Sequence, residues 1–399
     1  MRILKFLGAF LAILIIIFFI VFGFQLDTIY LLFENRDGMQ EGKEWIAKTS
    51  SLKNLTEYIG AQPEHVSIAS LAVDKPDSSI LYNEHTPRTM GRLSNIFLVI
   101  EYVRQIEEDN LDPDKPVPLS EVKLYQLPYI QASNHDDAIS TLSNQGKVSD
   151  DGMVALSDLV RIAVEFNDLA ASDYLLFSLG IDYVEQLMDR LDIAETEMVL
   201  PFSGLYISLN PYLYDTTFEQ RMDSLSRLSR PEFENLVVRT SRRFINDLVF
   251  REQVIHHFDQ NQGLGIKFTQ ERDALDIFPK TTALEMADLM KRIQQENLIS
   301  ISISQKIKEI LAWPLNNSRL KRDFKTYGAI YDSRMGMVNG IDYGASSYSG
   351  EPFAQAVFFD NLQVAFWFHM SSHLMHQDFE QRLIWDPALR EITERQTRE

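Results

Sequence analysis

Hydrophobic and polar positions alternate in different ways along the chain, and the first clear pattern follows residue 62. Residues 65–74 and 79–85 are rich in apolar and β-branched side chains and flank the turn sequence KPDS. This arrangement predicts a β-hairpin. From Ile96 to Ile106 the apolar residues recur every three or four positions, which predicts a helix directly after the hairpin.

The middle of the chain keeps this helical spacing. Residues 156–191 follow it as far as Gly180, where a helix end is expected, and then resume it. The stretch 205–278 contains an amphipathic helix at 234–258 and a polar loop. We interpret this stretch as an insertion in a helical lobe.

The last part of the chain returns to strand patterns. Residues 329–338, 352–360 and 362–370 are dominated by apolar and aromatic side chains and predict core strands, and 371–393 predicts a polar helix. Strands thus stand at both ends of the chain with helices between them. We expect an α+β fold in which both chain ends complete one antiparallel sheet and a helical lobe is inserted.

An uncharged run of apolar and glycine residues, from Phe6 to Phe24, precedes all of these elements. Its length is close to the roughly 20 residues that cross the hydrocarbon core of a bilayer. Positive residues precede the run and Asp27 and Glu34 follow it, which keeps the short N-terminus in the cytoplasm. No A-x-A-like cleavage site follows, so we expect an uncleaved anchor.

These patterns divide the chain into regions. We predict a cytoplasmic N-terminus at 1–5, a transmembrane anchor at 6–24, a membrane-proximal linker and helix at 25–62, and a domain at 63–399. Within that domain the sheet lobe comprises 63–88 and 325–399, and the helical lobe comprises 89–324 with the insertion at 205–278.

Charge and cysteine content restrict the possible partners and chemistry. The 38 Lys and Arg residues face 57 Asp and Glu residues, which sets the formal net charge at −19. We therefore expect no nucleic-acid partner. The chain has no cysteine, which excludes disulfides, thiolate nucleophiles and zinc–thiolate sites.

Three segments resemble the serine β-lactamase and penicillin-binding-protein superfamily, nearest to the class A β-lactamase-like serine hydrolases. They are the helix at 89–114, the helical segment at 156–191, and residues 278–300 followed by YGAIYDSRMG. The resemblance covers about residues 63 to 395 and implies a two-lobed β-lactamase-like fold. It also implies a Ser nucleophile with a Lys three residues later, an S-D-N loop, and a cationic K-T-G strand that holds a carboxylate.

The S-x-x-K motif is broken in either register. If Ser94 is the nucleophile, Phe97 takes the lysine's place, and a phenyl ring cannot accept a proton. If the sequence RLSN aligns with the motif, Arg92 replaces the serine and Asn95 the lysine. Serine is also favoured as a helix N-cap, and we expect that role for Ser94.

The other two motifs are altered as well. Asn167-Asp168-Leu169 stands where Ser-Asp-Asn is expected, so Asp168 is a catalytic remnant or a carboxylate that ties the loop, with Asn167 beside the substrate. Arg334-Met335-Gly336 stands in place of Lys-Thr-Gly. Arg334 either binds a substrate carboxylate or forms a strand-edge ion pair, and Gly336 keeps the close-approach glycine. The E-x-x-L-N motif of class A enzymes is not found.

Three histidines near the C-terminus raise a further possibility. His373 and His376 are three residues apart and His369 is close by, so a metal-dependent hydrolase is conceivable. Solvated helix histidines are the simpler interpretation, and we expect neither a metal nor another cofactor.

Two functional hypotheses follow from the resemblance. The first is a catalytically degraded domain anchored in the bacterial inner membrane through residues 6–24 and lying in the periplasm or outside the cell. It would bind peptidoglycan peptide or an envelope protein. The alternative is an active serine hydrolase of β-lactamase, D-alanyl-D-alanine carboxypeptidase or esterase type with Ser94 as nucleophile.

Overall fold

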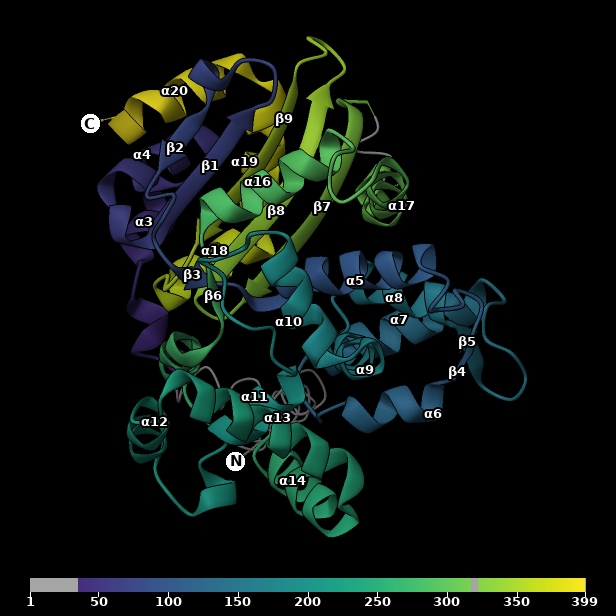
Figure 1. The fold of residues 1–399 in the computed structure, drawn as a ribbon. Coiled ribbons are helices and arrows are strands. Elements are labelled where there is room, and N and C mark those ends of the chain that lie inside the picture. The colour runs from purple at the N-terminus through teal and green to yellow at the C-terminus, as the bar shows by residue number, and fades with distance from the viewer. Residues whose placement is uncertain (1–34, 317–321, 399) are drawn as a thin grey trace, which may run out of the picture.

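A five-stranded antiparallel sheet organises the fold (Figure 1). The computed structural model describes residues 35–316 and 322–398. Strand order is β2-β1-β9-β8-β7, so strands from both ends of the chain lie side by side, as predicted. The strands are β1 Val66–Ala72, β2 Ile80–Tyr82, β7 Phe324–Arg334, β8 Met337–Ser346 and β9 Pro352–Phe359.

Helices cover both faces of the sheet because its central strands are apolar on both sides. Ala356 and Phe358 of β9 belong to the core that includes helix α16, whereas Val357 and Phe359 belong to the core that includes α18 and α19. The covering helices are α4 Leu52–Ala61, α16 Ala283–Gln294, α18 Val364–Ser372, α19 Met375–Trp385 and α20 Pro387–Arg398.

The helical lobe lies below the sheet in Figure 1 and has two cores. The first is continuous with the core between α16 and the sheet. In the helical lobe it is formed by α5 Asn95–Glu107, α7 Ala132–Asn144, α8 Leu156–Glu165, α9 Leu169–Leu179 and α10 Ile181–Arg190, with α17 Ile301–Leu311. The second is formed mainly by α11 Phe202–Leu209, α12 Phe218–Ser226, α13 Arg230–Asn246, α14 Leu248–Gln260 and α15 Phe268–Ala274. The predicted insertion therefore has a hydrophobic core largely its own.

The smaller elements connect these parts. Strand β3 Arg88–Thr89 pairs with β6 Lys280–Thr281, and β4 Pro116–Pro118 pairs with β5 Met153–Ala155. The short helices are α3 Lys43–Lys48, α6 Leu119–Val122, η2 Gly38–Gln40, η3 Pro63–His65, η4 Pro76–Ser78, η5 Gly91–Ser94, η6 Lys123–Tyr125, η7 Tyr212–Tyr214, η8 Leu275–Ile277 and η9 Trp313–Asn316.

The predicted strand at 362–370 is wrong, because this segment forms helix α18. Its aromatic and aliphatic residues are apolar at nearly every position, and such a run has no period that distinguishes a buried helix from a buried strand. Phe366 packs on the ring of Tyr58 at a centroid distance of 4.4 Å, which places the helix on α4. The prediction also missed β8, which follows β7 through the turn at Met335-Gly336.

Two predicted helices are each divided in two. The helix expected at 234–258 breaks at Asp247, whose carboxylate accepts the backbone N–H of Phe250 at 3.1 Å and so begins α14. The helix expected at 371–393 is divided into α19 and α20 at Asp386.

The lobe boundaries also differ from the prediction. Within the predicted linker at 25–62, helices α3 and α4 pack on α18 and α20 and so belong to the sheet lobe. Helix α16, which was assigned to the helical lobe, packs on the sheet. The predicted anchor at 6–24 lies outside the described residues. In the two described ranges, no helix has both the length and the apolar character needed to cross a membrane.

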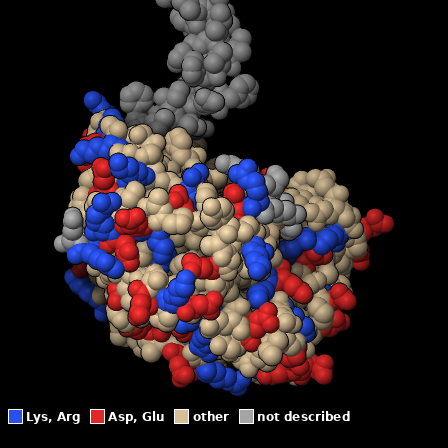
Figure 2. All heavy atoms as spheres, turned by 90° about the horizontal axis from the view of Figure 1, so that it is seen from above, with Lys and Arg blue, Asp and Glu red and all other residues tan. Residues whose placement is uncertain are grey.

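Positive and negative side chains are interspersed on the face shown in Figure 2. The acidic excess of the chain is therefore not gathered there into one negative patch.

Candidate active site

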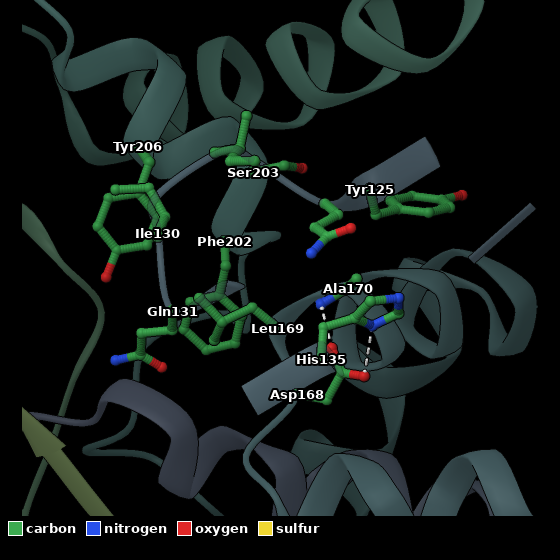
Figure 3. A pocket seen from close by; sticks show the side chains of 12 residues that line it. Tyr125, Ile130, Gln131, His135, Asp168, Leu169, Ala170, Phe202, Ser203 and Tyr206 are labelled. Atoms are coloured by element: carbon green, nitrogen blue, oxygen red, sulfur yellow. Dashed lines mark hydrogen bonds and ion pairs between the residues drawn. The ribbon is translucent and has the colours of Figure 1, made fainter. Parts of the chain in front are cut away.

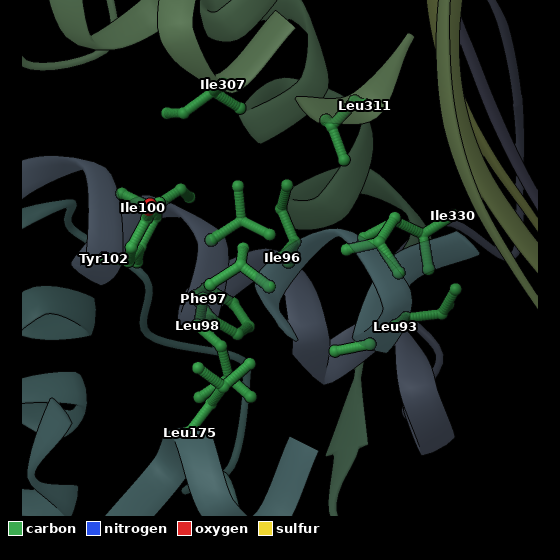
Figure 4. Close-up of a cluster of buried hydrophobic side chains, with 14 of the residues drawn as sticks. Leu93, Ile96, Phe97, Leu98, Ile100, Tyr102, Leu175, Ile307, Leu311 and Ile330 are labelled. Atoms are coloured by element: carbon green, nitrogen blue, oxygen red, sulfur yellow. The ribbon is translucent and has the colours of Figure 1, made fainter. Parts of the chain in front are cut away.

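The buried side chains of helix α5 fix the position of the turn that precedes it, η5 (Figure 4). Leu93, Ile96, Phe97 and Ile100 are all fully buried, and Ile307 and Leu311 of α17 belong to the same core. A helix packed on several sides has little freedom to rotate or shift along its axis. The 3-10 turn η5 in front of it is therefore fixed relative to the sheet.

Arg92, in that turn, is the point where the three resembling segments meet. Its Nη2 donates to the backbone oxygen of Ser333 on β7 at 3.1 Å, and its Nη1 donates to the backbone oxygen of Asn167 at 3.4 Å. Nη1 also donates to Oε1 of Gln131. The side chain of Arg92 is only 4% exposed. One guanidinium group thus joins the active-site helix, the loop of the second motif and the strand of the third.

Asp332 on β7 neutralises this buried cation. Its Oδ1 accepts Nε of Arg92 at 2.6 Å, and its Oδ2 accepts the backbone N–H of Arg92 at 2.7 Å. Gly91 makes this approach possible, since a Cβ there would lie 2.2 Å from Oδ2 of Asp332 and its φ is +54°. The carboxylate therefore binds both the side chain and the first turn of the helix.

Asp168 ties the loop before α9. Its Oδ1 accepts the backbone N–H groups of Ala170 and Ala171 at 3.0 and 3.3 Å, which makes it the N-cap of α9. Its Oδ2 lies 2.8 Å from Nδ1 of His135 on α7. These contacts cap α9 and join the loop to α7, which corresponds to the structural alternative of its two predicted roles.

The remaining cavity beside this loop is small (Figure 3). Tyr206, Ile130 and Gln131 lie on one side of it, and Tyr125, His135 and Asp168 on the other. Its volume is about 10 Å³, which is room for at most one water molecule.

Asn167 is held in the left-handed backbone region, with φ at +53°. Its Nδ2 donates to the backbone oxygen of Tyr331 at 3.0 Å, and so joins the loop to β7. Its Oδ1 is buried and has no hydrogen-bond partner among the described residues. The predicted substrate-side amide is thus used to join two parts of the protein.

Ser94 does not lie at this meeting point. It is two residues after Arg92 in a continuous helical turn, and a two-residue step places side chains on roughly opposite faces. The predicted N-cap role is wrong, because its side chain accepts no helix N–H and its backbone is already helical. Among the described residues, no Lys, His, Asp or Glu side chain bonds to its hydroxyl. Leu93 and Ile96, which are close to it in the sequence, are fully buried.

Arg334 forms the strand-edge ion pair, which was one of its two predicted roles. Its Nη2 donates to Oε1 of Glu271 at 2.6 Å, and the guanidinium lies 4.9 Å from the centre of the Tyr206 ring. Gly336 has φ at +84° in the β7–β8 turn, where a Cβ would lie 2.4 Å from Cγ of Arg272. The tight turn and this close packing account for the glycine.

The C-terminal histidines are not all solvated. His376 is fully buried on α19, and neither ring nitrogen has a hydrogen-bond partner in the described part of the chain. His373 is exposed, and Nε2 of His369 lies 2.9 Å from the backbone oxygen of Thr49. Over residues 35–316 and 322–398, no three His, Cys, Asp or Glu side chains are placed to hold a metal ion.

The chemistry of the site follows from Arg92. A guanidinium is always charged in proteins and offers only donors, so it is neither a nucleophile nor a proton acceptor. Asn95, three residues on, is buried and donates its Nδ2 to the backbone oxygen of Ala163 at 2.9 Å. Among the described residues, the groups that contact Arg92 provide hydrogen bonds and charge compensation, and none of them pairs a nucleophile with a base.

Sequence reasoning missed two members of this cluster, Asp332 and Gln131. Asp332 stands inside an apolar strand pattern, where a buried carboxylate needs a cationic partner. That signal, together with the register that places Arg92 at the nucleophile position, points to the pair. Gln131 comes from a separate loop before α7 and has no comparable signal.

The family comparison covers most of the chain. A family model described as the β-lactamase enzyme family matches residues 49–375. No curated protein matches the sequence.

Solved structures provide a second comparison. A β-lactamase from Sphaerobacter thermophilus has 13% identity and a TM-score of 0.46, and the match covers 80% of this chain and 97% of that one. A β-lactamase from Chitinophaga pinensis has 14% identity and a TM-score of 0.46, with 87% and 97% coverage. A mutant of PBP-A, as the acyl-enzyme complex with penicillin G, has 11% identity and a TM-score of 0.45, with 84% and 97% coverage. By the family match, this chain belongs to the β-lactamase enzyme family.

Proposed function

We propose that this protein is a member of the family that has lost acyl transfer and acts by binding at the cell envelope. The observation that carries the proposal is the buried Arg92–Asp332 pair at the meeting point of the three motif segments. A covalent mechanism needs a nucleophile and a base at that point. Arg92 supplies neither, and its removal from the site would leave Asp332 charged and buried.

The second part of the proposal is the location. Residues 6–24 anchor the protein in the bacterial inner membrane, and the folded part lies outside the cytoplasm. A peptide of the cell wall or an envelope protein is then the available class of partner.

Covalent labelling tests the loss of acyl transfer. The full chain, its Ser94→Ala variant and an active penicillin-binding protein are each incubated with a fluorescent penicillin and with a fluorophosphonate. We expect labelling of the active protein alone. Ser94→Ala is a usable control, because the Ser94 hydroxyl caps no N–H of α5, and no hydrogen bond joins it to another described residue. Labelling of the wild-type chain that disappears in Ser94→Ala would establish the alternative, an active serine hydrolase.

Cell fractionation tests the anchor. We expect the full chain in the membrane fraction after a high-salt wash, and accessible to protease in spheroplasts. A variant that lacks residues 1–24 should remain in the cytoplasm. If the full chain is soluble, or if protease reaches it only after lysis, the proposed location is wrong.

A further inference from the structure

A pocket of about 510 Å³ opens next to the Arg92 cluster. It is bounded by residues 129–131 before α7, by the loop 260–268 after α14, by Tyr212, and by the Arg334–Glu271 pair. Gln131 belongs to both places, since its Oε1 accepts Arg92 while its side chain lines the pocket. The pocket is therefore a site of ligand size directly outside the filled nucleophile position.

Two exposed tyrosines flank the loop of this pocket. Tyr129 is 56% exposed and Tyr212 is 44% exposed. The hydroxyl of Tyr212 donates to the backbone oxygen of Gly265 at 2.9 Å, and a Cβ on Gly265 would lie 2.7 Å from the ring. Gly263 similarly lies under Tyr129, with its added Cβ 3.6 Å from Cβ of Tyr129. The Tyr212 ring is thus positioned by its hydrogen bond and by Gly265, and both tyrosines are exposed at the pocket.

The polar groups of the pocket are mainly amides. Gln262 forms no side-chain hydrogen bond in the described structure, and Gln131 uses only its oxygen, for Arg92. Asn261 uses its Nδ2 for the backbone oxygen of His257 at 2.7 Å, which leaves its Oδ1 free. Uncharged amides both donate and accept, and so match hydroxyl groups better than they match a net charge.

The charges of the pocket are already balanced. Arg334 and Glu271 lie 2.6 Å apart and neutralise each other, so an anionic ligand would have to displace Glu271. The pair still offers donors and acceptors at the pocket wall. This favours a neutral ligand rich in hydroxyl groups.

The backbone around the pocket is unusual. Tyr129, Gln131 and Gln262 have φ values of +63°, +51° and +51°. The backbone of residues other than glycine rarely adopts this left-handed region. Such positions persist where the surrounding structure holds them, and they cluster at ligand sites. Here they belong to the two loops that line the pocket.

We propose that this pocket binds a neutral saccharide. Sugar rings carry C–H groups on one face and hydroxyls at the edge, so Tyr129 and Tyr212 contact the faces and the amides bind the hydroxyls. The inference rests on the proposed binding at the cell envelope, and it replaces the cell-wall peptide named there as ligand by the glycan of the cell wall. The pocket needs no catalytic group for this role.

Calorimetric titration of the full chain, in a detergent without a sugar headgroup, tests whether the pocket binds a neutral saccharide. The probes are the neutral trimers of N-acetylglucosamine and of glucose, with N-acetyl-D-alanyl-D-alanine as the anionic probe. We expect at least one trimer to bind. Tyr129→Ala should weaken binding by about two- to tenfold, as should Tyr212→Ala, because each removes one aromatic contact. Tyr129→Phe should bind as wild type does, because the ring remains.

Tyr183→Ala is the matched control, since Tyr183 is 55% exposed on α10 and does not line the pocket. It should leave the affinity unchanged. The inference is overturned if neither trimer binds, if both tyrosine variants bind like wild type, or if the dipeptide alone binds and requires Arg334. Penicillin labelling of the same preparation reports separately on the loss of acyl transfer, so the two proposals fail independently.

Discussion

Arg92→Met should lower the free energy of unfolding by about 3–5 kcal/mol, the usual cost of breaking a buried ion pair from one side. The substitution keeps most of the apolar stem but leaves the carboxylate of Asp332 charged and without its main partner in a fully buried position. Urea denaturation of the full chain measures the effect.

A double substitution separates charge from packing. In the Arg92→Met background, Asp332→Asn removes the uncompensated charge and keeps an oxygen for the backbone N–H of residue 92, so it should recover much of the lost stability. Arg227→Met removes the exposed pair with Asp223 and should cost less than about 1 kcal/mol. The account is contradicted if Arg92→Met costs no more than Arg227→Met, or if the second substitution destabilises further.

Raising the pH above 7 should destabilise the protein because two acidic side chains are buried between the sheet and helix α19. Asp342 on β8 and Glu380 on α19 are fully buried, and a Cβ on Gly340 would lie 2.0 Å from Oε2 of Glu380. Burial raises the pKa of both carboxyls well above the usual range, and the charge of Asp342 raises the pKa of Glu380 further. The hydroxyl of Tyr331 donates to Asp342 at 3.2 Å, but both oxygens of Glu380 lack a partner in the described structure.

The direction follows from proton binding. Between the unfolded pKa, about 4, and the raised folded pKa, the unfolded chain has released protons that the folded protein keeps. The free energy of unfolding therefore falls as pH rises, by up to about 1.4 kcal/mol per pH unit for each such group. His376 faces the same region, and burial lowers its pKa to about 3, which makes stability rise with pH below about 6.5. The effect of His376 lies below about pH 6.5, so a change in the free energy of unfolding above pH 7 reports on Asp342 and Glu380.

Neutral replacements test this assignment. Tyr327 and Gln355 are the other polar groups in contact with Asp342, and Gln381 contacts Tyr327. Gln355 also donates to the backbone oxygen of Glu380. Glu380→Gln should raise stability at pH 8 relative to wild type, and Asp342→Asn with Glu380→Gln should largely remove the fall between pH 7 and 9. Glu391→Gln, which changes an exposed acid of α20, should leave the pH profile unchanged. A wild-type profile that is flat over this range would refute the assignment.

The sequence predicted the elements whose hydrophobic pattern has a clear strand or helix period. The hairpin at 65–85, the strand at 352–360 and the helix after residue 95 have clear alternation or helical spacing, and the structure confirms them. The run at 362–370 could not be assigned correctly, because it is apolar in either conformation. The division at Asp247 depends on one side-chain bond that a helical pattern conceals.

The sequence predicted which segments form the candidate site, but it did not predict which side chains meet there. The resemblance brought together the three segments that meet at Arg92. Which of Ser94 and Arg92 stands at the meeting point depends on a two-residue register, and only the contacts to Asn167 and Ser333 decide it. The hydrogen bond from Arg92 to Gln131 depends on the conformation of a loop that is distant in the sequence.

The most direct test of the central claim is a crystal structure of the protein soaked with penicillin G. The account predicts the Arg92 guanidinium against Asp332, with no covalent density on any serine near the head of α5. Acyl density on Ser94 or another serine there, with Arg92 moved out of the site, would contradict it.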